Sequence, residues 1–167
     1  PRIGAEIFPA VETRQLQLRL RAPTGTRIER TEVMALKAMD VIKEAVGPDN
    51  VEITTGFIGV QPPSYPINTI FLFTSGQHEA VLGVALKPAA PAVNEALKET
   101  LRQKLKSALP NVSISFEAAD IISQVMSFGS PTPIEVAVQG PSLPDNRSFA
   151  EKLRGELEKV SSLRDLQ

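Results

Sequence analysis

Few residues in this sequence have the types and spacing that catalytic chemistry requires. The chain contains one histidine, His78, and no cysteine. A lone histidine in a predicted turn, beside Gly76 and Glu79, is typical of a solvated surface residue. The sequence also lacks nucleophile-elbow, P-loop and dinucleotide-binding motifs, and clusters of His, Asp and Glu with metal-ligand spacing. We therefore predict no catalytic residue, no metal site and no cofactor, and we expect that the protein is not an enzyme.

Three methionines are further candidates for metal binding, and one acid is a further candidate for proton transfer. Met34 and Met39 fall on one predicted helix, and Met126 lies far from them along the chain. Methionines so placed favour core filling over binding of a soft metal. Asp120 is the one acid in an apolar neighbourhood, and we interpret it as a helix cap or a surface ion-pair partner.

The segment from Gly56 to Thr69, GFIGVQPPSYPINT, is the best candidate for binding. It contains three prolines, two glycines, one Phe and one Tyr, directly after a predicted strand. Loops of this length are uncommon in compact domains and often carry function. Phe57 and Tyr65 would offer aromatic faces to an apolar ligand. Phe57 could equally be a core residue, because it continues the alternation of its strand, and Tyr65 could contact a neighbouring subdomain.

Periodicity and turn signals predict the elements that surround this loop. Alternating leucines predict a half-buried strand at 15–21, and the capping-box spacing of Thr26 and Glu29 predicts a helix start. GPDN at 47–50 should end that helix. The next predicted elements are a strand at 51–57, with Val51, Ile53, Thr55 and Phe57 on one face, and extended segments at 69–74 and 80–87 joined by a turn. A helix from Pro91 follows, with Val93, Leu97, Leu101, Leu105 and Leu109 in one row. A strand at 111–117 comes after this helix.

This order predicts an α+β fold, the ferredoxin-like split βαβ sandwich, over residues 1–128. Residues 118–129 could form a short helix or a connecting crossover. A strand at 132–140 and a helix with Phe149, Leu153, Leu157 and Val160 facing inward would then begin a second, incomplete βα unit over 129–167. A strand without its neighbours should join the first sheet, pair with another molecule or be poorly ordered.

Charge and hydropathy exclude several classes of partner. The net charge is −1, so no basic field attracts nucleic acid or anionic lipid. No apolar run reaches the roughly 18 residues of a membrane span, and no signal peptide opens the chain. The sequence starts at PRIGAEIFPA and stops at LRDLQ. We expect a fragment of a longer protein.

Three stretches together resemble the resistance–nodulation–division (RND) efflux transporters. IFPAVETRQLQLRLRAPTGTRIERTE resembles the segment that follows the seventh membrane helix of that family. ADIISQVMSFGSPTPIEVAVQG resembles its crossing between two porter subdomains, and FAEKLRGELEKVSSLRDLQ resembles the helix that comes next. The matching positions in the first stretch are Phe8, Pro9, Glu12, Gln15, Pro23, Gly25, Thr26, Glu29, Arg30 and Thr31.

The resemblance implies a place in a proton-driven exporter of the bacterial inner membrane. The chain would be the first half of the second periplasmic loop, with the complete subdomain PC1 and the opening strand and helix of PC2. It would line the cleft by which hydrophobic or amphiphilic substrates enter. Its partners would be the membrane helices and docking domain of the same protein, two further copies in a homotrimer, a periplasmic adaptor and an outer-membrane channel.

The same resemblance gives the candidate loop a role. Gly56, Phe57 and Gly59 match the start of a glycine- and Phe-rich loop that separates two drug pockets in multidrug members. Residues 61–65 depart from it, because prolines replace glycines and stiffen the backbone. Met126 is one position from a methionine of the metal-exporting branch, so we favour organic substrates over metal ions.

Three alternatives remain open. The first is a free-standing ferredoxin-like module that binds a small ligand or regulates a partner, since this fold hosts many functions. The second is a fragment of a heavy-metal RND exporter. The third is an enzyme such as an acylphosphatase, which would require an anion-binding loop that the sequence lacks.

Overall fold

The computed structural model describes residues 13–60, 74–119 and 134–166. Tyr65, the predicted extended segment at 69–73, Asp120 and Met126 lie outside these ranges, and so does the predicted boundary between residues 128 and 129. In the described ranges, no helix combines the length and the apolar composition that crossing a bilayer requires.

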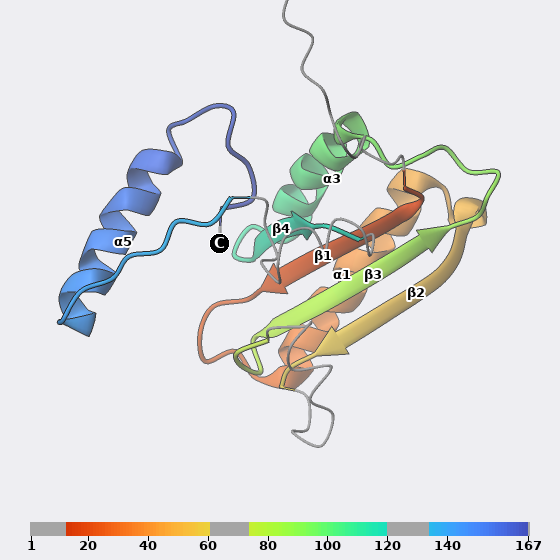
Figure 1. Cartoon of the computed structure of the whole chain (residues 1–167). Helices are drawn as coiled ribbons and strands as arrows, with labels where there is room; N and C mark the ends of the chain where they lie inside the picture. Colours follow the sequence, from red (N-terminus) through yellow and green to blue (C-terminus); the bar gives the residue numbers. More distant parts are fainter. Residues whose placement is uncertain (1–12, 61–73, 120–133, 167) are drawn as a thin grey trace, which may run out of the picture.

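A four-stranded antiparallel sheet forms the centre of the structure, as Figure 1 shows. Its strand order is β2-β3-β1-β4, so β1 and β3 are central and β2 and β4 are edges. The strands are β1 Gln15–Arg21, β2 Val51–Ile58, β3 Glu79–Leu86 and β4 Ser113–Glu117. With α1 and α3 between them, the elements follow βαββαβ order, and the predicted ferredoxin-like α+β class is confirmed.

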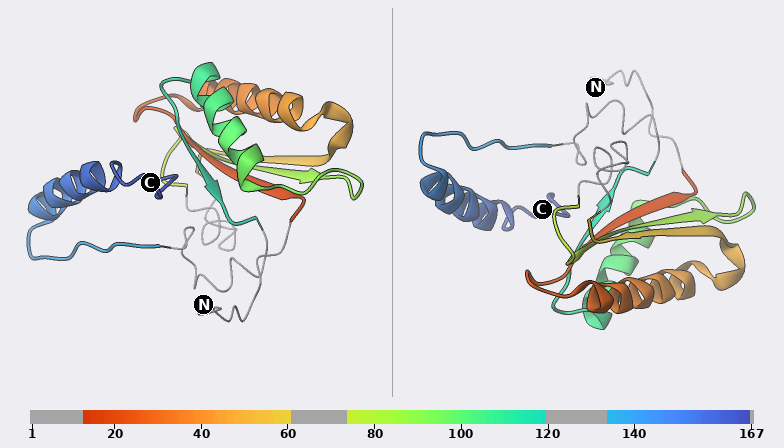
Figure 2. Two further views of the ribbon diagram at one scale, coloured as in Figure 1. Left: turned by 90° about the horizontal axis from the view of Figure 1, so that it is seen from above. Right: turned by 90° about the horizontal axis from the view of Figure 1, so that it is seen from below.

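Helices α1 (Ile28–Val46) and α3 (Glu95–Ala108) cover one face of this sheet, as the two views of Figure 2 show. Between them and the sheet lies the apolar core. Fully buried members come from both layers and include Leu18, Leu20, Ile42, Leu82, Leu101 and Leu105. The strands supply alternate residues and the helices supply residues three or four apart, as expected for two amphipathic layers.

Both helices begin later than the sequence signals indicate. The cap of α1 is Arg27, which makes no side-chain capping bond. Instead of capping with Glu29, Thr26 donates its hydroxyl to the carbonyl of Pro23 at 2.6 Å. The expected start of the second helix at Pro91 is also wrong, because Asn94 caps α3 by accepting from the backbone N–H of Leu97 at 2.8 Å.

Strand β2 changes face near its start. The register with β3 shifts between Val51 and Ile53, where one extra residue forms a bulge. Val51 packs against the core, whereas Ile53 and Phe57 are exposed on the opposite face. The predicted single row of Val51, Ile53, Thr55 and Phe57 is therefore wrong at Val51, and Phe57 is not a core residue. A bulge reverses the alternation on either side of it, which a period of two cannot anticipate.

The second predicted unit differs from expectation in two ways. Residues 134–140 form no strand, and none of the four strands pairs with them. Helix α5 (Leu143–Leu157) is present but buries no residue, and Phe149 is exposed. The inward-facing row that we predicted for this helix is wrong, because an extended segment without neighbouring strands cannot cover it. Figures 1 and 2 show α5 apart from the sheet and its two helices.

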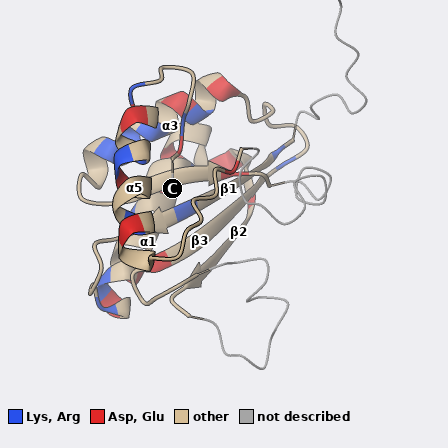
Figure 3. Ribbon diagram, turned by 60° about the vertical axis from the view of Figure 1, so that its left-hand side comes forward, with Lys and Arg blue, Asp and Glu red and all other residues tan. Residues whose placement is uncertain are grey.

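Charged residues of both signs are interspersed along the helices, as the colours of the ribbon in Figure 3 show. On α5, Arg147 pairs with Glu151 and Arg154 with Glu158, both at 3.2 Å and one helical turn apart. Such exposed pairs stabilise a helix weakly and create no field of one sign.

Two glycines with positive φ allow a test of backbone strain against steric contact. Gly59 has φ +74°, and a Cβ there would lie 2.8 Å from Ile28 Cδ1. Gly25 has φ +90°, and a Cβ there would meet nothing within 4 Å. Alanine at either position should cost about 1–2 kcal/mol for the left-handed backbone, with an additional cost at Gly59. Urea unfolding of Gly59→Ala and Gly25→Ala would measure both, and equal losses would contradict the additional contact.

Candidate functional site

The sheet face opposite the helices carries a buried network of charged side chains, which we call the polar sheet face. Arg19 on β1 is only 3% exposed, and its Nε donates to Glu117 Oε1 on β4 at 2.5 Å. Gln17 donates to the other oxygen of Glu117 at 2.9 Å. On the other side of β1, Arg19 Nη1 lies 3.9 Å from Glu79 Oε2 on β3. The network therefore links β1 to both of its neighbours.

Glu79 forms the second half of this network. Its carboxylate accepts from Arg21 Nε at 2.7 Å and from the backbone N–H and hydroxyl of Ser75 at 2.9 and 2.8 Å. Burial by itself would raise the pKa of Glu79, but the bonds from Ser75 and the charge of Arg21 outweigh it, so the pKa lies below its ordinary value. Glu79 therefore stays ionised and joins the turn before β3 to the end of β1.

His78 belongs to this turn and is not the solvated residue that we predicted. Its side chain is largely shielded, and Nε2 lies 3.9 Å from Glu79 Oε1. Its ring packs so closely over Gly76 that a Cβ there would lie 2.7 Å from two ring atoms. Because Arg21 and Ser75 already occupy the carboxylate of Glu79, the pair has the geometry of a structural turn and not of an acid–base dyad.

The structure separates the predicted binding residues. Gly56 faces the helices, where a Cβ would lie 3.4 Å from Leu82 Cδ2, whereas Phe57 points to the opposite face. Gly59 adopts the positive φ of the turn after β2, beside Ile28. Phe57 and the two glycines are neighbours in sequence but do not line one surface. The fourth predicted residue, Tyr65, lies outside the described residues.

Phe57 belongs to a row of residues that crosses the whole sheet. The pairings Phe57–Val81, Val81–Arg19 and Arg19–Ser115 place these four residues on the same face. Val81, Arg19 and Ser115 are buried, whereas Phe57 is 36% exposed and its neighbour Ile53 is 58% exposed. The row therefore passes from a buried polar centre to an exposed apolar edge, where an apolar ligand or another polypeptide could make contact.

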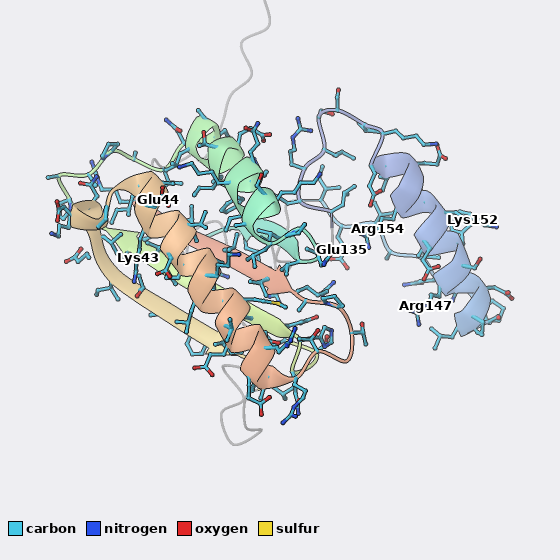
Figure 4. All side chains as sticks on the ribbon, turned by 180° about the vertical axis from the view of Figure 1, so that it is seen from behind. Lys43, Glu44, Glu135, Arg147, Lys152 and Arg154 are labelled. Atoms are coloured by element: carbon cyan, nitrogen blue, oxygen red, sulfur yellow. The ribbon has the colours of Figure 1, made fainter. Side chains whose placement is uncertain are left out.

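A shallow open groove of about 650 Å³ lies between residues 134–140 and α5. Its apolar lining comes from Val136, Val138, Phe149 and Leu153, and Asp145 and Lys152 lie at its rim. Figure 4 shows Lys152 pointing away from the sheet and its two helices. The groove is the uncovered inner face of the helix, and it brings no set of catalytic groups together.

A bidentate ion pair connects the end of the chain to α3. Arg102 donates to the two carboxylate oxygens of Asp165 at 3.0 and 2.7 Å, and its guanidinium lies 5.2 Å from the centre of the Phe116 ring. The bond to Asp165 raises the pKa of Arg102 above its ordinary value, although burial opposes the shift. This geometry holds Asp165 against helix α3.

The ion network is the main feature that sequence analysis missed. The alternation in QLQLRLR correctly predicts a strand. On a half-buried strand, however, we expect the arginines on the solvent-exposed face. The available signals were Glu117, in a predicted strand that could pair with it, and Glu79, in the predicted turn directly before another. Within the described ranges, no group of three or more His, Asp or Glu residues could hold a metal ion, and no buried side-chain nitrogen or oxygen lacks a hydrogen bond.

Comparison with known proteins identifies a structural likeness and no sequence relative. No family model and no curated protein matches the chain. Two crystal forms of a heavy metal efflux pump match it at 19% sequence identity, with TM-scores of 0.72 and 0.70. Each match covers 91% of this chain and 15% of the pump chain. This chain therefore spans less than a sixth of those proteins, and the likeness establishes a shared fold.

Removing one member of the buried ion pair should be costly. Glu117→Gln should lower the free energy of unfolding by about 3 kcal/mol, because it leaves the buried charge of Arg19 poorly compensated. The same substitution in an exposed pair, Glu151→Gln, should cost at most about 0.5 kcal/mol. The double variant Arg19→Met/Glu117→Leu should cost less than the sum of its single changes. Additive losses in urea unfolding would contradict coupling between the two residues.

The lowered pKa of Glu79 predicts an acid-dependent loss of stability. A carboxylate whose pKa is lower in the folded state stabilises above its unfolded pKa, near 4.5, and this contribution disappears as the pH falls through the folded value. Glu79→Gln should therefore be less stable than the wild type by about 2 kcal/mol at pH 7. The gap should narrow progressively below pH 4.5. Urea unfolding across this range would measure it, and a gap independent of pH would contradict the ionised network.

Proposed function

We propose that this chain is a porter-domain segment of a proton-driven RND efflux transporter, at the entry of the substrate cleft. One observation carries the proposal: 91% of the chain has the fold of a segment that makes up 15% of a heavy metal efflux pump. The three sequence stretches that resemble this family lie in the first and last thirds of the chain and support the same assignment. Fold alone does not specify function, so the two arguments are needed together.

The proposal defines the chain's surroundings. The segment lies in the periplasm as part of an inner-membrane protein, with membrane helices and a docking domain supplied by the rest of the same polypeptide. The complete transporter is a homotrimer that works with a periplasmic adaptor and an outer-membrane channel. Residues 13–119 then belong to the PC1 subdomain, and residues 134–166 belong to the beginning of PC2.

Hydrophobic or amphiphilic organic compounds are the substrates we propose. The support is the exposed apolar edge of the sheet, where Ile53 and Phe57 lie on one face of β2. An exposed aromatic ring beside an aliphatic side chain suits the face of an apolar or cationic organic molecule. Gly59 holds the turn after β2 against Ile28, so the position of Phe57 is well defined at this edge.

Heavy-metal ions are a second candidate, and a specific observation favours them. The two matched structures are both described as a heavy metal efflux pump. The two classes make opposite predictions for a strain that lacks the full-length transporter. Loss of an organic-compound exporter sensitises cells to dyes and detergents, whereas loss of a metal exporter sensitises them to silver, copper or zinc ions. Unchanged susceptibility to both panels would contradict the transporter proposal itself.

Phe57→Ala in the full-length transporter tests the proposed contact. Loss of one aromatic face removes about 1 kcal/mol of interaction, which corresponds to roughly a fivefold weaker apparent affinity. The minimum inhibitory concentration of the affected compounds should therefore fall. Val33→Ala, another change of an exposed apolar side chain, on helix α1 behind the opposite face of the sheet, is the matched control and should have no effect. Wild-type resistance to every exported compound in Phe57→Ala would remove Phe57 from the site.

A further inference from the structure

Strand β2 is an edge of the sheet, and it lacks the usual protection of edge strands. Among the described strands, only β3 pairs with it. Its sequence, VEITTGFI, has one charged residue, Glu52, and neither proline nor lysine. Natural edge strands normally avoid pairing with other chains by carrying such residues. Two of its apolar side chains, Ile53 and Phe57, are exposed, so both its backbone and its side chains are open to a partner.

The hydrogen-bond pattern specifies which backbone groups face outward. The N–H of Gly59 donates to the carbonyl of Glu79 at 2.8 Å, in the same register as the pairing of Phe57 with Val81. Bonded pairs in an antiparallel ladder alternate, so Thr55 and Phe57 also direct their backbone groups to β3. The N–H and C=O groups of Thr54 and Gly56 therefore point away from the sheet.

This edge is complementary to itself. An antiparallel pairing of two copies with its twofold axis at Thr55 places Thr54 opposite Gly56 of the second copy, and both residues direct their backbone groups outward. The same register places Ile53 opposite the second copy's Phe57, twice, on one face. These are non-hydrogen-bonded positions, where opposed side chains approach most closely. We propose that β2 is a self-pairing edge through which two copies of this chain form an antiparallel dimer.

The dipoles of the two α1 helices also favour the antiparallel orientation of the dimer. Helix α1 runs alongside β2 in the opposite direction, with Lys43 and Glu44 in the region near the strand's start (Figure 4). In the dimer, the two α1 helices are antiparallel, so their dipoles oppose each other favourably. A second copy therefore satisfies the backbone and the apolar side chains of this edge at once. The proposal concerns the 167-residue chain and does not depend on the transporter assignment.

Sedimentation equilibrium of the 167-residue chain across a concentration series tests the dimer. Thr54→Pro removes an outward N–H and leaves the bonds to β3 in place, as edge strands tolerate. It should weaken dimerisation by at least about tenfold. Val33→Lys, which changes an exposed apolar residue on α1 instead, should dimerise like the wild type. Circular dichroism verifies that each variant is folded.

Charge exchange tests the register. Ile53→Lys and Phe57→Glu should each weaken the dimer, because each places a charge opposite an apolar side chain. The double variant Ile53→Lys/Phe57→Glu should recover dimerisation, since every introduced lysine then faces an introduced glutamate of the other copy. Within one strand these two positions are about 13 Å apart, so a contact inside one chain cannot produce the rescue.

Three outcomes would overturn the proposal. A wild-type chain that remains monomeric throughout the series has no self-pairing edge. A dimer that survives Thr54→Pro, or that Val33→Lys abolishes, uses another surface. Loss of dimerisation in both single charge variants without recovery in the double variant excludes the register centred on Thr55.

Discussion

Arg19 is buried in this sheet with carboxylates from both neighbouring strands beside it. Glu117 on β4 accepts its Nε at 2.5 Å, and Glu79 on β3 lies 3.9 Å from its Nη1. A buried charge without such partners would cost several kcal/mol, roughly the whole stability margin of a small domain. The order of β3, β1 and β4 is therefore constrained by electrostatics as well as by apolar packing.

The two faces of β1 together make its register specific. Leu16, Leu18 and Leu20 are buried under the helices, while Arg19 and Arg21 meet carboxylates on the other face. A slip by one residue in either pairing would place arginines in the apolar core and separate the ion pairs. Toward β2 this double constraint ends, because the row from Arg19 through Val81 reaches Phe57 at an exposed edge. Rigidity at the centre and accessibility at the edge thus arise from the same arrangement.

Sequence periodicity predicts the elements of the fold, but it does not predict which residues form the site. Alternating leucines located β1, and leucines four apart located α3, because each pattern reflects burial of one face. Phe57 was harder to assign, because the bulge between Val51 and Ile53 reverses the face of β2 and depends on pairing with β3. Local patterns alone do not predict the burial of Arg19 and Glu117, since these two residues lie 98 positions apart in the chain. Local signals failed similarly at Thr26, whose hydroxyl donates to the nearby carbonyl of Pro23 and does not accept from a helix N–H.

Helix α5 shows the opposite case. Its apolar spacing correctly predicts a helix, but the described residues include no sheet that covers the apolar face of this helix. Phe149 and Leu153 have the spacing of a core-facing row, yet they line an open groove with Val136 and Val138. Burying one such side chain is worth about 1.5–3 kcal/mol, so this unit leaves much of its potential stabilisation unused. Residues 134–140 offer one extended segment, whereas a sheet that covers a helix requires several. In the proposed transporter, neighbouring parts of the porter domain would supply those strands and convert the groove into a core. The described sheet needs no such completion at its centre, because Arg19, Glu79 and Glu117 already satisfy its polar face.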